Sequence, residues 1–175
     1  MRILLVLVSL SLHVFGQLAY DRPVDWNLPD PAQKCMEASH IFDRFSLSDR
    51  VNPFYLRGDF DGDGQQDYAV LVTDQKSKKS AMVICLSSHK SADVLGKSGR
   101  MIRVGTKSDG YDLEDFDWMD AWQVHPRIAP IPSELNDAST VGKMVGEGIR
   151  VERTEAASAL VYWDGTNFRW YQLSD

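Results

Sequence analysis

The stretch that most constrains the fold is an acidic, glycine-containing run that passes directly into an apolar one. It reads DFDGDGQQDYAVLV and covers residues 59–72. Four carboxylates this close in sequence repel one another, so a folded chain has to compensate their charge. Gly62 and Gly64 allow the backbone to turn tightly, and residues 68–72 are apolar enough for a buried strand. The sequence therefore predicts a tight acidic loop between strands.

The spacing of these carboxylates favours a calcium site. Calcium takes about six to eight oxygen ligands, several of them carboxylates. Asp59, Asp61 and Asp63 supply oxygens at alternate positions. Gln65 is placed to offer its main-chain carbonyl, and Asp67 closes the set. Calcium is favoured over magnesium because an all-protein carboxylate cage suits the larger ion. The alternative is a solvated acidic turn held by Asx hydrogen bonds.

The loop does not fit an EF-hand. An EF-hand loop has a bidentate glutamate at its twelfth position. Counted from Asp59, that position is Val70, which lies inside the apolar run. The fourth carboxylate, Asp67, comes three residues earlier, and the flanking residues are typical of strands rather than helices. The pattern indicates a nine-residue loop between two strands.

The pattern Asp-x-Asp-Gly-Asp-Gly-x-x-Asp before an apolar strand resembles the calcium loop of FG-GAP and related VCBS-type repeats. Such repeats form the blades of integrin-alpha-like propellers. The resemblance covers residues 54–86 and implies one set of metal ligands. These are Asp59, Asp61, Asp63, Gln65 through its carbonyl, and Asp67. A propeller needs several blades, but the sequence has no second aspartate loop. The chain therefore resembles one isolated repeat within a small domain, and its C-terminal segment is similar to small secreted bacterial proteins.

Residues 1–16 are typical of a secretory signal peptide. Arg2 precedes the apolar run Ile3–Phe15, and small residues then suit cleavage before Gln17. The run is shorter than the roughly 20 residues of a membrane span, which argues against the alternative of an uncleaved anchor. We therefore expect a secreted or periplasmic protein with no membrane contact after cleavage.

Net charge and cysteine content narrow the partners and the compartment. The chain carries a net charge of −6 at pH 7, which argues against nucleic acid or an anionic membrane as the main partner. The same balance is compatible with binding a cation. Cys35 and Cys85 predict a disulfide in an oxidising compartment, and the alternative is a pair of buried thiols.

The chain after the signal peptide predicts one α+β domain with a mainly antiparallel sheet and one amphipathic N-terminal helix. Residues 17–30 form an extended lead-in, and residues 31–175 form the domain. We expect the helix over residues 31–46, because Asp30 is a suitable cap and Pro31 suits the first helical position. One apolar stripe follows at helical spacing: Ala38, Ile41, Phe42 and Phe45.

Short apolar runs separated by polar turns predict the strands. They cover residues 54–56, 68–73, 81–86, 101–104, 148–153, 159–163 and 168–173. The segment 105–143 is acidic and contains prolines. We interpret it as a long connection that packs on the sheet through Trp118 and Trp122.

Two further groups of residues are candidates for function. The first is a second acidic run made of Asp109, Asp112, Glu114, Asp115, Asp117 and Asp120. Its spacing matches no ligand template, and such runs are usually solvated faces. The second group is the aromatic C-terminal hairpin of Tyr162, Trp163, Phe168, Trp170 and Tyr171. Strand alternation places about half of these side chains in the core.

The sequence favours a secreted, non-catalytic calcium-binding domain. The ion would stabilise the strand–loop–strand unit of a binding or interaction module, whose partner would be an extracellular protein or glycan. One alternative is a hydrolase that acts on glycans with carboxylates of the 109–120 run beside Trp118 and Trp122. Another is an extracellular inhibitor or interaction protein that presents the aromatic hairpin.

Overall fold

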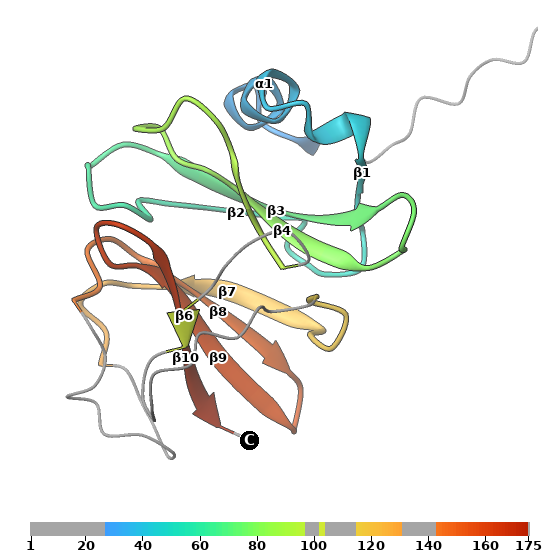
Figure 1. Ribbon diagram of the computed structural model, residues 1–175. Helices are drawn as coiled ribbons and strands as arrows, with labels where there is room; N and C mark the ends of the chain where they lie inside the picture. The colour runs from blue at the N-terminus through green and yellow to red at the C-terminus, as the bar shows by residue number, and fades with distance from the viewer. Residues whose placement is uncertain (1–26, 97–101, 104–114, 131–142, 175) are drawn as a thin grey trace, which may run out of the picture.

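The computed structural model describes residues 27–96, 102–103, 115–130 and 143–174. The expected signal peptide and most of the expected lead-in lie outside these residues. The described chain forms two mainly antiparallel sheets that pack face to face, with one short helix on the outer face of the first sheet (Figure 1). The predicted α+β class is therefore confirmed.

The first sheet comes from the N-terminal half of the described chain. Its strands are β1 (Phe45–Leu47), β2 (Tyr55–Gly58), β3 (Asp67–Asp74), β4 (Ser80–Cys85) and β5 (Asp93–Leu95). They follow the order β1-β3-β4-β5, and β2 pairs with β3 beside β1. All pairs in this sheet are antiparallel.

The second sheet comes from the C-terminal half. Its strands are β6 (Ile102–Arg103), β7 (Ala121–His125), β8 (Gly148–Arg153), β9 (Ala157–Trp163) and β10 (Phe168–Ser174). They follow the order β6-β10-β9-β8-β7, and only the β6–β10 pair is parallel. The predicted C-terminal hairpin is confirmed as β9 and β10, which pair antiparallel.

The central strands β3 and β4 are buried on both faces, and their side chains alternate between two hydrophobic clusters. Ala69 and Leu71 of β3 face the second sheet, whereas Val70 and Val72 face the helix. This alternation follows from the two-residue period of a strand. It explains why β3 is an almost continuous apolar run, as is typical of a strand covered on both sides.

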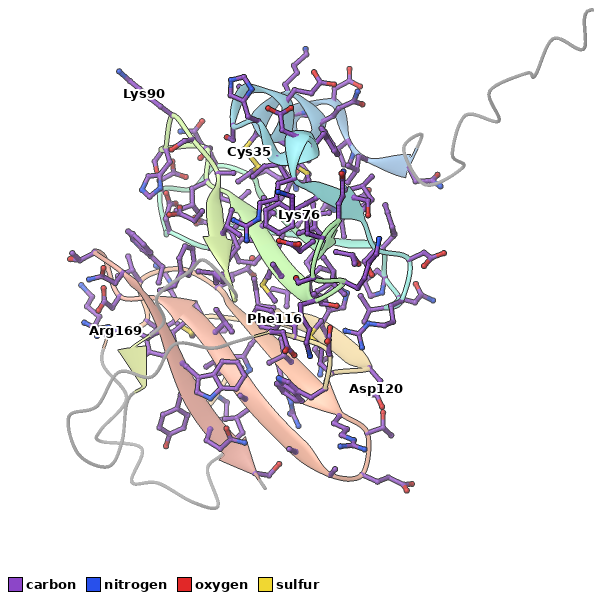
Figure 2. The ribbon with its side chains drawn as sticks, turned by 45° about the vertical axis from the view of Figure 1, so that its right-hand side comes forward. Cys35, Lys76, Lys90, Phe116, Asp120 and Arg169 are labelled. Carbon is purple, nitrogen blue, oxygen red and sulfur yellow. A yellow bond between two sulfur atoms is a disulfide. The ribbon has the colours of Figure 1, made fainter. Side chains whose placement is uncertain are left out.

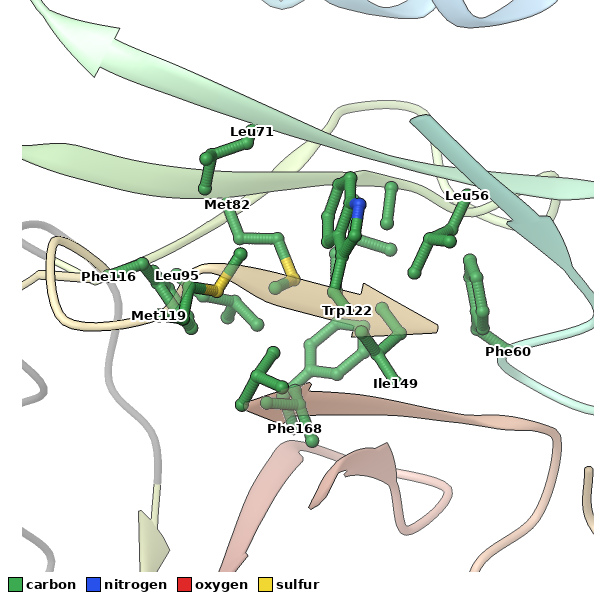
Figure 3. Packing of buried hydrophobic residues seen from close by; sticks show 14 of the residues in the cluster. Leu56, Phe60, Leu71, Met82, Leu95, Phe116, Met119, Trp122, Ile149 and Phe168 are labelled. Carbon is green, nitrogen blue, oxygen red and sulfur yellow. The ribbon is translucent and has the colours of Figure 1, made fainter. Parts of the chain in front are cut away.

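The core between the sheets draws residues from both of them (Figure 3). Leu56 and Phe60 approach from the first sheet, and Trp122 and Ile149 approach from β7 and β8. All four are almost fully buried. The indole N–H of Trp122 donates to the Pro53 carbonyl at 2.7 Å, so the polar edge of this ring is also satisfied.

Helix α1 (Asp30–Ala38) packs Ala32 and Met36 against the outer face of the first sheet. Cys35 of the helix is bonded to Cys85 of β4, which confirms the predicted disulfide (Figure 2). Because the bond spans 50 residues of sequence, it stabilises the fold by roughly 4 kcal/mol in the chain-entropy model.

The predicted helix over residues 31–46 is wrong in its second half. Helix α1 ends at Ala38, and His40 adopts a left-handed conformation that a helix cannot continue. A short 3-10 turn, η2 (Ile41–Asp43), then leads into β1. Asp30 is the first helical residue rather than a cap, because Pro29 occupies the cap position without a side-chain hydrogen bond. Ile41 and Phe45 are buried as predicted, but from a turn and a strand.

The strand predictions are confirmed at β2, β3, β4, β8, β9 and β10, and at the described residues of β6. Three strands were not predicted: β1, β5 and β7. Strand β7 lies within the segment 105–143, which was expected to be a connection. The expected packing through its tryptophans is confirmed, because Trp122 is buried between the sheets and Trp118 packs against the same cluster.

Candidate metal centre

The predicted aspartate loop connects β2 and β3. Gly58 pairs with Asp67 across the two strands, so this register closes the loop over residues 59–66. Gly62 and Gly64 have φ angles of 77° and 82°, a left-handed backbone that glycine adopts without a steric penalty. The pairing partners and the two glycines therefore fold this loop as the sequence predicts.

Three of the four loop carboxylates converge at one point. Asp59, Asp61 and Asp67 each offer one carboxylate oxygen, and these three oxygens lie within 4.8 Å of one another. Asp67 is fully buried, and the other two residues are half-buried. Like charges at this separation repel strongly when they are partly removed from water. A bound divalent cation would attract all three carboxylates and offset their mutual repulsion.

One oxygen of this cluster is buried without a hydrogen bond. Oδ1 of Asp59 is inaccessible to solvent and has no hydrogen-bond partner among the residues that the structure describes. A buried carboxylate oxygen that lacks a partner carries the full desolvation penalty. A cation of the size of calcium would satisfy it, because calcium is coordinated by carboxylate oxygens at about 2.3–2.6 Å. This orphaned atom is the observation that fits the residues to a metal ion.

The side chain of Asp67 is held rigidly at the base of the loop. Its Oδ2 accepts the Phe60 amide at 2.8 Å, and its Oδ1 accepts the Ser87 amide at 2.7 Å. Burial raises the pKa of Asp67, and the hydrogen bonds from Ser87 and Phe60 oppose that rise. The nearby charge of Asp61 raises the pKa further. A bound cation would act in the opposite sense and favour the ionised form.

Of the other two predicted ligands, Asp63 is not among the three converging carboxylates, and Gln65 was predicted to contribute only its main-chain carbonyl. Oδ1 of Asp63 accepts the Gln65 amide at 2.7 Å, and its Oδ2 accepts the Ser87 hydroxyl at 3.0 Å. Gln65 is exposed. Their binding to a metal therefore stays a prediction. The Asp63–Gln65 contact is an Asx-type hydrogen bond, as a solvated turn would also have.

Three residues beside the loop were not predicted from the sequence. Ser87 and Ser88, in the connection from β4 to β5, donate hydroxyl hydrogen bonds to Asp63 and Asp61. Glu147, just before β8, accepts the Asp59 amide at 2.9 Å. All three are distant from the loop in sequence and lie in no recognisable ligand pattern. Only the pairing of the strands and the packing of the sheets bring them to the loop.

The described part of the second acidic run makes structural contacts. Lys79 Nζ lies 3.0 Å from carboxylate oxygens of both Asp115 and Asp117. Desolvation raises the pKa of Asp117, but hydrogen bonds from Lys79 and Ser80 outweigh it, so the pKa is lowered. Asp120 accepts both the amide and the hydroxyl of Thr154. Asp109, Asp112 and Glu114 lie outside the described residues.

The aromatic hairpin belongs mostly to the core. Phe168 and Trp170 face the first sheet, and Tyr162 and Tyr171 lie in a separate cluster on the opposite face. All four are at least 96% buried. Trp163 is half-buried, with its ring 4.9 Å from that of Phe168. The core interpretation is therefore confirmed, and these side chains form no exposed aromatic strip.

Comparison with known proteins identified no relative: no family model, no curated protein and no solved structure matches the chain. The resemblance of residues 54–86 to FG-GAP and VCBS-type repeats therefore stays a prediction. Within the described ranges, no helix is long and apolar enough to cross a membrane.

Proposed function

We propose that this protein is a non-catalytic calcium-binding domain in which the ion fixes the β2–β3 loop. Two observations carry the proposal: Asp59, Asp61 and Asp67 converge, and one buried Asp59 oxygen has no hydrogen-bond partner among the described residues. Calcium binding would replace the repulsion among these carboxylates with attraction to a shared ion. The domain then serves binding or interaction outside the cell, where its disulfide persists.

The proposed ligand set extends beyond the three converging residues. Asp63 and the main-chain carbonyl of Gln65 complete the coordination, as the resemblance to FG-GAP and VCBS-type repeats implies. The arrangement of β2, loop, β3 and β4 as consecutive antiparallel strands supports this resemblance. In binding calcium, Asp63 would exchange its hydrogen bond to Ser87 for a bond to the ion.

Thermal unfolding with and without calcium tests the proposal. A ligand that binds only the folded state stabilises it by about 2.7 kcal/mol at 100 times its Kd. We expect calcium to raise the Tm of the chelator-treated protein, and Asp59→Asn to abolish the rise. Asp49→Asn is the matched control, because it removes an exposed carboxylate outside the loop and should leave the rise intact.

Magnesium at the same concentration discriminates between the two ions. We expect a much smaller rise in Tm with magnesium, because that ion demands octahedral geometry and retains several of its waters. An unchanged Tm of the wild-type protein over a wide range of calcium concentrations would refute the proposed function.

A further inference from the structure

The main chain of Asp59 is held by a residue of the other half of the molecule. The Glu147 amide donates to the Asp59 carbonyl at 2.7 Å, and Oε2 of Glu147 accepts the Asp59 amide at 2.9 Å. Both polar groups of the Asp59 backbone are thus bonded to one residue. Because those groups flank the Cα atom, these two bonds fix the direction in which the Asp59 side chain leaves the main chain.

The segment that carries Glu147 approaches the loop too closely for any side chain between them. A Cβ atom on Gly146 would lie 2.3 Å from the Asp59 carbonyl oxygen and 2.4 Å from the Phe60 carbonyl. On the loop side, a Cβ atom on Gly62 would lie 2.6 Å from the Val145 carbonyl oxygen. The two backbones are therefore in direct contact, and glycine is needed on each side of the contact.

This segment belongs to the second sheet. The Val145 amide donates to the Trp163 carbonyl of β9 at 3.1 Å, and Glu147 directly precedes β8. Phe60, which follows Asp59, is 1% exposed and packs between the sheets. The position of Asp59 thus depends on how the second sheet packs against the first.

We propose that Gly146 and Glu147 are positioning residues for the metal centre, so that cation binding and packing of the two sheets are coupled. The inference rests on the proposed function, because Asp59, the residue that the second sheet would position, is a proposed metal ligand. Residues that orient a metal ligand typically alter metal affinity by about 10–100-fold when they are changed. The coupling is reciprocal, so the cation also tightens the contact between the sheets.

Calorimetric calcium titration of folded variants tests the inference. Gly146→Ala places a methyl group against the Asp59 and Phe60 backbone, and Glu147→Ala removes the acceptor of the Asp59 amide. We expect each to weaken calcium binding by about 10–100-fold. Glu147→Gln retains an acceptor oxygen and should restore most of the affinity.

Gly148→Ala is the matched control. Its methyl group would meet the flexible end of Leu160, 2.6 Å away, instead of the loop backbone. It should reduce stability but leave the calcium affinity within about threefold of wild type. Should Gly146→Ala fail to fold, the comparison of Glu147→Ala with Glu147→Gln decides the question alone. Calcium should also slow hydrogen exchange at the Glu147 amide, which bonds Asp59.

The outcomes separate this inference from the proposed function. Normal calcium binding by both Gly146→Ala and Glu147→Ala would overturn the positioning role and leave the calcium site standing. Equal losses in Glu147→Ala and Glu147→Gln would assign the effect to the charge of Glu147 and also overturn positioning. No calcium binding by the wild-type protein would overturn both proposals.

Discussion

Asp74 closes β3 at the end remote from the aspartate loop and shows what a fully satisfied carboxylate looks like in this fold. Its Oδ1 accepts the amides of Lys76 and Ser77, and its Oδ2 accepts Arg44 Nε at 2.8 Å. The Ser77 amide and the Arg44 guanidinium hold the pKa of Asp74 well below its usual range. Asp59, by contrast, keeps one buried oxygen for which the described part of the chain offers no hydrogen-bond partner.

The lowered pKa of Asp74 predicts a specific loss of stability in acid. A carboxyl group whose folded pKa is lowered stabilises the fold above its unfolded pKa, near 3.8, and loses that contribution as the pH falls further. We expect Asp74→Asn to lower the free energy of unfolding at neutral pH. The same variant should flatten the acid dependence below about pH 4.

Urea unfolding from about pH 5 to about pH 2 checks this prediction. Asp43→Asn is the control, because it removes a solvent-exposed carboxylate next to Arg44 in sequence. If the free energy of unfolding falls equally steeply with decreasing pH in the wild type and in Asp74→Asn, Asp74 is not the source of the acid dependence.

The residues of the candidate metal centre divide into those that the sequence predicts and those that it does not. Asp59, Asp61 and Asp67 are recognisable because their spacing and the glycines among them lie within one nine-residue stretch. Glu147 and Ser88 are not recognisable, because each reaches the loop through tertiary packing. A local pattern reports which oxygens are near one another along the chain, but not which distant residues orient them.

At the scale of elements, the loop between β2 and β3 contains two glycines with the same backbone conformation and different surroundings. Gly62 and Gly64 both have positive φ. An added Cβ on Gly62 would contact the Val145 carbonyl, whereas on Gly64 it would meet open space. Alanine substitutions at the two positions therefore distinguish two contributions to stability. One is the cost of a left-handed non-glycine residue, and the other is the cost of disturbing the contact between the sheets.

We predict that Gly64→Ala lowers the free energy of unfolding by about 1–2 kcal/mol, the usual cost of a left-handed non-glycine residue. Gly62→Ala should lower it further, because its methyl group also displaces Val145. Urea unfolding in the presence of a chelator measures both changes without a contribution from bound metal. Equal losses in the two variants would show that the contact at Gly62 adds nothing to stability.

The elements that were predicted correctly are those whose pattern is local and long. Strands β3 and β4 have apolar runs bounded by polar turns, and the β9–β10 hairpin surrounds a turn at Asp164–Gly165. Strands β1 and β5 have only three residues each. Such short strands are defined by a partner rather than by their own sequence. The predicted helix is too long because Ile41 and Phe45 are buried at helical spacing in sequence, although they lie in a 3-10 turn and in strand β1.

At the scale of the whole molecule, the core between the sheets contains residues of both halves of the chain. Leu71 and Ile84 of the first sheet share one cluster with Val151 and Val161 of the second. Each sheet therefore depends on the other to cover its inner, apolar face. The two sheets should therefore unfold together, because separating them would expose apolar surface on both.

Two optical probes can test whether unfolding is cooperative. Tryptophan fluorescence reports mainly on the second sheet, because the four tryptophans among the described residues lie in or beside it: Trp118, Trp122, Trp163 and Trp170. Far-UV circular dichroism reports on both sheets. We expect the two urea curves to coincide. Ile84→Val in the first sheet should lower the free energy of unfolding by about 0.5–1.5 kcal/mol as measured by either probe. Ile128→Val, at a position 92% exposed, should shift neither curve, and two separate transitions would contradict the prediction.

The close approach of Gly146 to the loop bears on whether this loop can be transplanted into another protein. Its Cβ-free backbone lies against Asp59 and Phe60, and the neighbouring Glu147 bonds both polar groups of Asp59. A scaffold given residues 59–67 alone would inherit the acidic side chains without the surface that orients the first of them. An engineered recipient would also need a facing glycine and an acceptor at the site of Glu147. The smallest portable unit is therefore a pair of segments, and their contacting residues Asp59 and Glu147 are 88 positions apart in sequence.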